Sequence, residues 1–101
     1  MTSVCTGALV LGKAGLLEGK RATTHWYFLD PMRELFPGTT VEKHLHVVEE
    51  GDLFTSAGIS AGIDMALKVV ARCFGEAVAR ATARHMEYPY PDSNARRIAM
   101  T

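Results

Sequence analysis

Apolar and polar positions follow two patterns along the chain, one typical of short strands and one typical of helices. Strands are predicted where short apolar or β-branched runs lie between turn residues, over 1–5, 22–24, 39–42, 44–48 and 52–55. The last two segments flank Glu49, Glu50, Gly51 and Asp52, which suit a tight exposed turn. We therefore expect these two segments to form a β-hairpin.

Helices are predicted over 6–14, 31–36, a long segment that opens within 55–62 and continues to 74, and 76–87. The first helix carries apolar residues on every face, so it should be buried rather than lie on the surface. The long helix has two apolar faces, which implies packing on both sides and places Cys73 in the core. Asp30 followed by Pro31 is expected to cap the second helix.

The chain also contains signals for where helices end. Gly15 suits the left-handed cap of the first helix, and Gly75 should end the long one. In the last helix we expect Ala77, Val78 and Ala81 to face inward. Residues 92–101 follow Pro91 and are expected to form a mobile tail.

The order strand, helix, strand, helix, hairpin, helix, helix predicts an α/β domain with a mainly parallel sheet over residues 1–91. Such sheets place their sites at the carboxyl ends of the strands. Cys5 and His25 each fall at the end of a predicted strand. If those two strands are neighbours in one sheet, both side chains reach the same crevice.

Composition narrows the function classes. The formal net charge is zero, which argues against a polyanionic partner such as nucleic acid. No apolar run approaches the roughly 20 residues that span a bilayer, and the N-terminus lacks a secretory signal pattern. The chain has two cysteines, far apart and without metal-ligand spacing. These features favour a cytoplasmic domain with free thiols.

Cys5 with His25 is the sharpest chemical pair. A cysteine between a strand and a helix lies at the positive end of the helix dipole beside unpaired backbone N–H groups, and both favour the thiolate. A histidine within hydrogen-bond reach can accept the thiol proton. The amide of Thr6 is the natural half of an oxyanion hole. The alternative is that Cys5 is a small buried hydrophobe and His25 an ordinary strand-end residue.

Small and aromatic residues near these segments are candidates for a substrate pocket. The candidates are Gly7, Trp26, Ser56, Gly58 and Ser60. The stretch 55–62 is small and flexible, so its backbone can approach a ligand or another element. The two serines are equally explained as caps and turn formers, and Trp26 as a packing residue.

Other titratable residues have simpler explanations. His44 and His46 alternate along a predicted hairpin strand and so share a face, but they lack a third ligand in view. We expect no metal site. Asp64, near the start of the long helix, is expected to be a structural partner of nearby backbone or of Ser60.

Three stretches in order carry a family resemblance: residues 3–8 (Ser-Val-Cys-Thr-Gly-Ala) continuing to 14–17 (Ala-Gly-Leu-Leu), residues 22–26 (Ala-Thr-Thr-His-Trp), and residues 55–64 (Thr-Ser-Ala-Gly-Ile-Ser-Ala-Gly-Ile-Asp). Together they resemble the DJ-1/PfpI family of class I glutamine amidotransferase-like proteins over about residues 1–90. The resemblance implies a flavodoxin-like, Rossmann-like three-layer sandwich, with Cys5 as nucleophile on an elbow, Thr6 at the oxyanion position and His25 near the cysteine.

Within the family, the sequence is most similar to isonitrile hydratase-like proteins. That branch implies a lyase reaction, the cysteine-dependent addition of water to an isocyanide carbon to give an N-substituted formamide, with no cofactor. The alternatives are a ligand-sensing domain related to AraC-type transcription regulators, or a PfpI-like amidase or hydrolase.

The resemblance also implies that the N-terminal half of the domain is absent from this chain. That half would supply the first strands, an acidic residue facing the cysteine, and the loop that completes the oxyanion hole. We expect a homodimer or a second chain that supplies this half, with a small-molecule substrate and no nucleic acid or membrane partner. Inactivity of the isolated fragment is one alternative.

Overall fold

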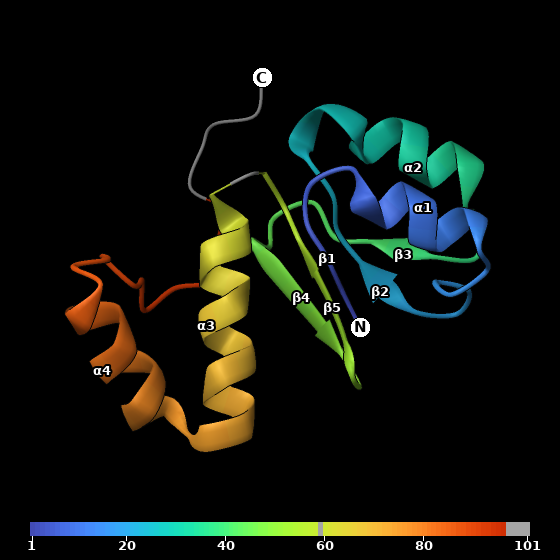
Figure 1. Cartoon of the computed structure of the whole chain (residues 1–101). Coiled ribbons are helices and arrows are strands. Elements are labelled where there is room, and N and C mark those ends of the chain that lie inside the picture. Colours follow the sequence, from blue (N-terminus) through green and yellow to red (C-terminus); the bar gives the residue numbers. More distant parts are fainter. Residues whose placement is uncertain (59, 97–101) are drawn as a thin grey trace.

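Strands in the middle of the molecule separate two layers of helices (Figure 1). The computed structural model describes residues 1–58 and 60–96. Its elements are β1 (Thr2–Ser3), α1 (Gly7–Lys13), β2 (Arg21–Ala22), the 3₁₀ turn η1 (Trp26–Phe28), α2 (Leu29–Leu35), β3 (Thr40–Val41), β4 (Val47–Glu50), β5 (Leu53–Ser56), α3 (Ala61–Phe74) and α4 (Glu76–His85). The three-layer, flavodoxin-like α/β architecture confirms the predicted fold class.

The strands form two small sheets. In the first, β5 lies in the middle, parallel to β1 and antiparallel to β4, while β2 and β3 pair in parallel in the second. The predicted hairpin is confirmed, with Gly51 and Asp52 between β4 and β5 and Gly51 at φ 60°. Since β1 and β2 belong to different sheets, the strands that end near Cys5 and His25 are not paired neighbours.

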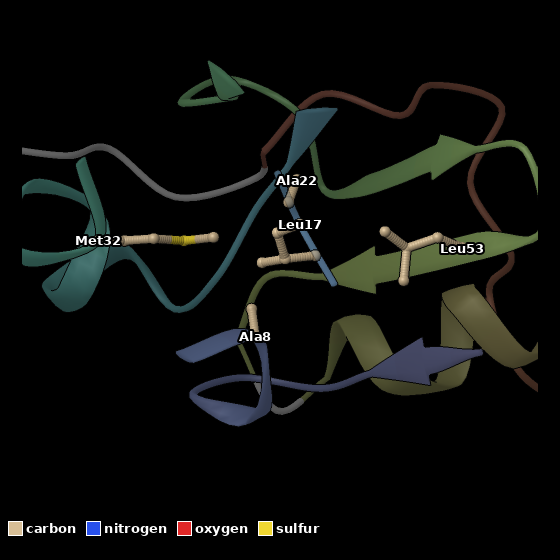
Figure 2. Packing of buried hydrophobic residues seen from close by; sticks show 5 residues of the cluster. All are labelled: Ala8, Leu17, Ala22, Met32 and Leu53. Atoms are coloured by element: carbon tan, nitrogen blue, oxygen red, sulfur yellow. The ribbon is translucent and has the colours of Figure 1, made fainter. Parts of the chain in front are cut away.

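Successive residues of β5 point to opposite faces of the sheet, and each face has its own core. On one face, Leu53 joins a buried cluster with Ala8, Leu17, Ala22 and Met32 (Figure 2). These four side chains come from α1, the loop after it, β2 and α2. On the other, Phe54 packs with Val47 and with Met65 of α3. The sheet is therefore covered on both faces, as its mainly apolar strands require.

Two expectations for the first helical layer need correction. Of α1, only Ala8 is buried, and Val10 is 70% exposed. The apolar residues on the outer face of α1 are therefore exposed, because no described element covers that face. α2 begins at Leu29 with Phe28 at its cap position, while Asp30 lies in its first turn and pairs with Arg33 at 2.8 Å.

In the second helical layer, α3 and α4 lie where helices were predicted, but different residues of them are buried. α3 packs on β4 and β5 and also against α4, and Gly75 ends it at φ 100°. Cys73, expected in the core, is exposed. In α4 the buried residues are Ala79 and Ala83 rather than the three predicted ones. None of the described helices is long and apolar enough to cross a membrane.

The segment after α4 is ordered where the structure describes it. Ala95 forms an antiparallel bridge with Leu45, and the Asn94 side chain exchanges two hydrogen bonds with the backbone of Val47. Of the tail expected over 92–101, residues 94–96 thus lie along the 44–47 segment, and Asp92 pairs with Arg80 of α4 at 3.0 Å. Residues 97–101 are outside the described part of the chain.

Candidate active site

Cys5 occupies the turn between β1 and α1 in a backbone conformation that L-residues rarely adopt. Its φ is 55°, in the left-handed region, which costs a non-glycine residue roughly 1–2 kcal/mol. Hydrogen bonds hold it from both sides: its N–H donates to the Ala57 carbonyl at 3.0 Å, and its carbonyl accepts from the Thr24 hydroxyl at 2.6 Å. Such strain persists only where the surroundings over-determine it, which is typical of a nucleophile elbow.

The backbone after Cys5 leaves one donor available. Gly7 N–H donates to the Val4 carbonyl at 2.9 Å, which closes the turn. The Thr6 amide donates no hydrogen bond within residues 1–58 and 60–96, and Thr6 is exposed at the start of α1. An unpaired amide beside a half-buried sulfur can donate to an anion that forms on an atom bound to that sulfur.

His25 lies next to the elbow without bonding to it. Its neighbour Thr24 makes the hydroxyl contact to Cys5, but no hydrogen bond joins the Cys5 sulfur and the imidazole among the described residues. Instead, His25 Nδ1 accepts from the Tyr27 amide at 3.2 Å, where η1 begins. Since a neutral imidazole carries one N–H, this contact assigns the hydrogen to Nε2. In that form the ring donates to a thiolate or substrate rather than accepting the thiol proton.

A small cavity of about 160 Å³ opens beside His25. Of the predicted pocket residues, Trp26, Gly58 and Ser60 line it. His46, Ala57 and Arg96 complete the lining, and Cys5 is not among these residues.

Two other predicted pocket residues have structural positions. Ser56 is fully buried in β5, and its hydroxyl donates to the Ser3 carbonyl of β1 at 2.9 Å. Gly7 lies in the first turn of α1, where an added Cβ would stand 3.4 Å from that of Ser3. Neither residue lines the cavity, because both join the elbow to its supporting strand.

Behind the cavity lies a buried polar group that sequence analysis missed. His46 Nε2 is 2.7 Å from one Asp64 oxygen, and the Tyr88 hydroxyl donates to the other at 2.6 Å. Asp64 is 1% exposed, so these two contacts satisfy a carboxylate that water hardly reaches. These two partners come from distant segments of the chain, whereas the sequence analysis considered only nearby backbone and Ser60.

His46 differs from His44, which is exposed, so the two histidines do not act as one pair. No group of three or more His, Cys, Asp or Glu side chains lies close enough to hold a metal ion in the part of the chain that the structure describes. The only signal for His46 in the sequence was the buried acid itself, since an aspartate in an apolar helix needs a partner.

Arg96 closes the cavity from the C-terminal segment. Its Nε donates to the Lys43 carbonyl at 2.9 Å, and its Nη2 donates to the Thr23 hydroxyl at 2.8 Å and the Thr24 carbonyl at 3.2 Å. Burial lowers the pKa of Arg96 from its ordinary value. The guanidinium remains a cation at neutral pH, since arginine titrates far above it.

Comparison with known proteins identifies relatives of this chain. The chain is 50% identical over 88 residues to an isonitrile hydratase from Pseudomonas putida, covering 87% of this chain and 37% of that protein. It is 42% identical over 74 residues to the HTH-type transcriptional regulator CdhR from Pseudomonas aeruginosa, covering 73% of this chain and 22% of the regulator. The chain thus spans well under half the length of these relatives.

Solved structures and a family model complete the comparison. A ThiJ/PfpI family protein from Pseudomonas syringae superposes with a TM-score of 0.78 at 38% identity, over 92% of this chain and 38% of that one. The model of the DJ-1/PfpI family matches residues 1–72, from β1 into α3. The chain belongs to the DJ-1/PfpI family.

Proposed function

We propose that this chain carries the cysteine part of an isonitrile hydratase-like site, in which Cys5 attacks a small electrophilic substrate and water is added to it. The observation that supports this most is the left-handed backbone of Cys5, fixed by Ala57 and Thr24 beside the unengaged Thr6 amide. The 50% identity to an isonitrile hydratase favours this reaction over others that use a cysteine elbow.

The proposed chemistry uses Cys5 as the nucleophile and His25 as a proton donor. The Cys5 thiolate forms a bond to the terminal carbon of the isocyanide, and the same carbon takes a proton, for which His25 Nε2–H is a candidate donor, to give a thioimidate. Water then adds to this carbon while the nitrogen takes a proton. The carbon–sulfur bond breaks as the new hydroxyl loses its proton, which leaves the formamide and returns the thiolate. The sum is one isocyanide and one water converted to one N-substituted formamide, with no change of oxidation state and no cofactor.

The rest of the site is proposed to come from a second chain or a second copy. The relatives are much longer, and the outer faces of α1 and α2 form an apolar groove of about 660 Å³. Its lining is Leu9, Val10, Lys13, Ala14, Leu35 and Phe36. An apolar groove of this size on helices of a sandwich is a natural surface for the missing elements to cover.

A chimera tests the proposal with the remaining elements in place. The matching segment of the Pseudomonas putida isonitrile hydratase is replaced by the 88-residue stretch of this chain to which it aligns. We expect the chimera to convert cyclohexyl isocyanide to N-cyclohexylformamide, measured by chromatography of the product.

Cysteine variants of the chimera supply the control. Cys5→Ser should abolish formamide production, since a hydroxyl is a far weaker nucleophile at neutral pH. Cys73→Ser should leave it unchanged, because Cys73 is exposed at the far end of α3. A folded chimera that makes no formamide, or one whose Cys5→Ser variant stays active, refutes the proposal.

A second candidate is a ligand-sensing domain, favoured by the 42% identity to CdhR. A sensor needs the cavity but not the nucleophile. It predicts that a small molecule binds equally well to the wild-type protein and to Cys5→Ser, with no product formed. Binding that requires Cys5 excludes this candidate.

A further inference from the structure

The cavity beside His25 presents hydrogen-bond donors and a cation, and its lining contains no acidic side chain. Arg96 brings the cation, His25 an Nε2–H, and Ser60 a hydroxyl. The nearest acid behind this lining, Asp64, has its oxygens held by His46 and Tyr88 and is not a lining residue. The cavity therefore favours a ligand group that accepts hydrogen bonds and carries negative charge.

The charge of Arg96 has no counterion among the residues that the structure describes. All of its side-chain partners are neutral oxygens, from Lys43, Thr23 and Thr24. Its Nη1 group makes no hydrogen bond to any described residue. A half-buried cation without an opposite charge is costly unless a ligand supplies one, so an anion that reaches Nη1 would gain both charge and hydrogen bonds.

Arg96 is also held firmly enough to act as a recognition element. Its backbone N–H donates to the His44 carbonyl at 2.7 Å, and Asn94 bonds both to Val47 and, through its carbonyl, to the His46 amide at 2.7 Å. These contacts fix the C-terminal segment along the cavity. The guanidinium is thus positioned before any ligand arrives, which lowers the entropy cost of binding.

From this arrangement we propose that the cavity is a carboxylate-binding subsite, with Arg96 as its specificity-determining residue and the indole of Trp26 as an apolar wall. The volume of about 160 Å³ admits one carboxylate with an apolar group as small as a phenyl ring. If the proposed hydratase activity holds, an isocyanide that bears a carboxylate is preferred over the uncharged cyclohexyl isocyanide and is placed with its reactive carbon toward Cys5. The binding claim stands independently of that reaction.

Trp26 is the only tryptophan of the chain, so its fluorescence reports on this cavity. Benzoate and the neutral benzamide are titrated at constant ionic strength into the full chain carrying Cys5→Ser, so that turnover plays no part. We expect benzoate to change the Trp26 emission saturably, with an affinity about tenfold or more above that of benzamide. Equal affinities for the two probes, or no saturable change with benzoate, overturn the proposal.

Two arginine variants locate the effect. Arg96→Gln should remove the preference for benzoate, whereas Arg84→Gln, at an exposed residue of α4 away from the cavity, should retain it. Circular dichroism checks that both variants keep the helical content of the wild-type protein. A preference that persists in folded Arg96→Gln contradicts the assignment to Arg96. The comparison of benzoate with benzamide can also be made on the wild-type chain, because neither probe is an isocyanide, and it then needs no variant.

Discussion

The strained backbone of Cys5 links the fold to the chemistry. A φ of 55° is unfavourable for any residue with a Cβ, and it is retained because Ala57 and Thr24 bond to the two backbone groups of Cys5. The amide of Thr6, the next residue, donates no hydrogen bond to any described residue. An unfavourable backbone conformation is thus retained at one residue after β1, which fits the proposed role of Cys5.

Glycine at residue 5 should therefore be better tolerated than alanine. Glycine adopts positive φ without the Cβ clash, so we expect Cys5→Gly to be more stable than Cys5→Ala by about 1 kcal/mol. Urea denaturation of both variants measures the free energies of unfolding. As a control, Ala66→Gly in the middle of α3 should show the opposite order, with glycine less stable. Equal stability of the two variants at residue 5 would argue against strain there.

His25 shows what the sequence could and could not reveal at this scale. The sequence predicted a strand over 22–24 that ends at His25, whereas β2 ends at Ala22 and His25 lies at the start of η1. The hydrogen bond between His25 and Tyr27 was not predictable, because that contact depends on the 3₁₀ turn η1, whose aromatic residues have no apolar periodicity. The change from proton acceptor to donor follows from this local geometry.

How well an individual helix or strand could be predicted depended on the residues that it contains. The hairpin β4–β5 was predictable because Gly51 and the flanking acids leave one place for the turn. The orientation of α4 was not, because alanines lie on every face and each gains little from burial. Ala79 and Ala83 are buried there, while Val78 is 46% exposed. Where a helix consists mainly of small residues, contacts with neighbouring elements therefore decide which of its faces is buried.

Contacts between residues far apart in the sequence could not be predicted from local sequence patterns. His46, Asp64 and Tyr88 come from the hairpin, α3 and the segment after α4, and nothing in their spacing links them. The same holds for Arg96, which reaches Thr23 across most of the chain. Sequence analysis therefore predicted the lining residues near the elbow and in the small-residue stretch 55–62. It did not predict His46 and Arg96, which only the folded chain brings to the cavity.

The contact between α1 and α2 predicts a coupling between two residues. A Cβ added at Gly12 would lie 2.6 Å from the Phe36 ring, closer than real contacts allow. Gly12→Ala should therefore destabilise the protein by about 1–2 kcal/mol despite the better helix propensity of alanine. In a Phe36→Leu background the same change should become neutral or stabilising. Chemical denaturation of the four proteins measures the coupling, and additive effects would contradict this packing.

The molecule as a whole leaves apolar surface open at both helical layers. Val10 and Leu35 are 70% and 64% exposed on one side, and Phe74 is 73% exposed at the end of α3. Because the chain spans 37% of the isonitrile hydratase it matches, the groove on α1 and α2 is our proposed contact for a second chain or copy. The described residues therefore form the fold around Cys5, while in our proposal a second chain or copy completes the site.

Association should depend on that groove. We expect sedimentation equilibrium of the chain to show self-association at micromolar concentration, and Val10→Glu to weaken it about tenfold or more by placing a charge in the apolar contact. Phe74→Glu, on the other helical layer, is the matched control and should change association little. If Phe74→Glu disrupts association and Val10→Glu does not, the interface lies on the wrong face for this proposal.

The reactivity of the two cysteines tests the central claim most directly. The protein is treated with limiting iodoacetamide at neutral pH, and mass spectrometry follows the alkylation of Cys5 and Cys73. Cys73 is exposed and Cys5 only half-buried, so accessibility alone favours Cys73. If the elbow and the adjacent amides favour an anionic sulfur, Cys5 reacts faster by about tenfold or more. Alkylation of Cys73 at an equal or higher rate would contradict the assignment of Cys5 as an activated nucleophile.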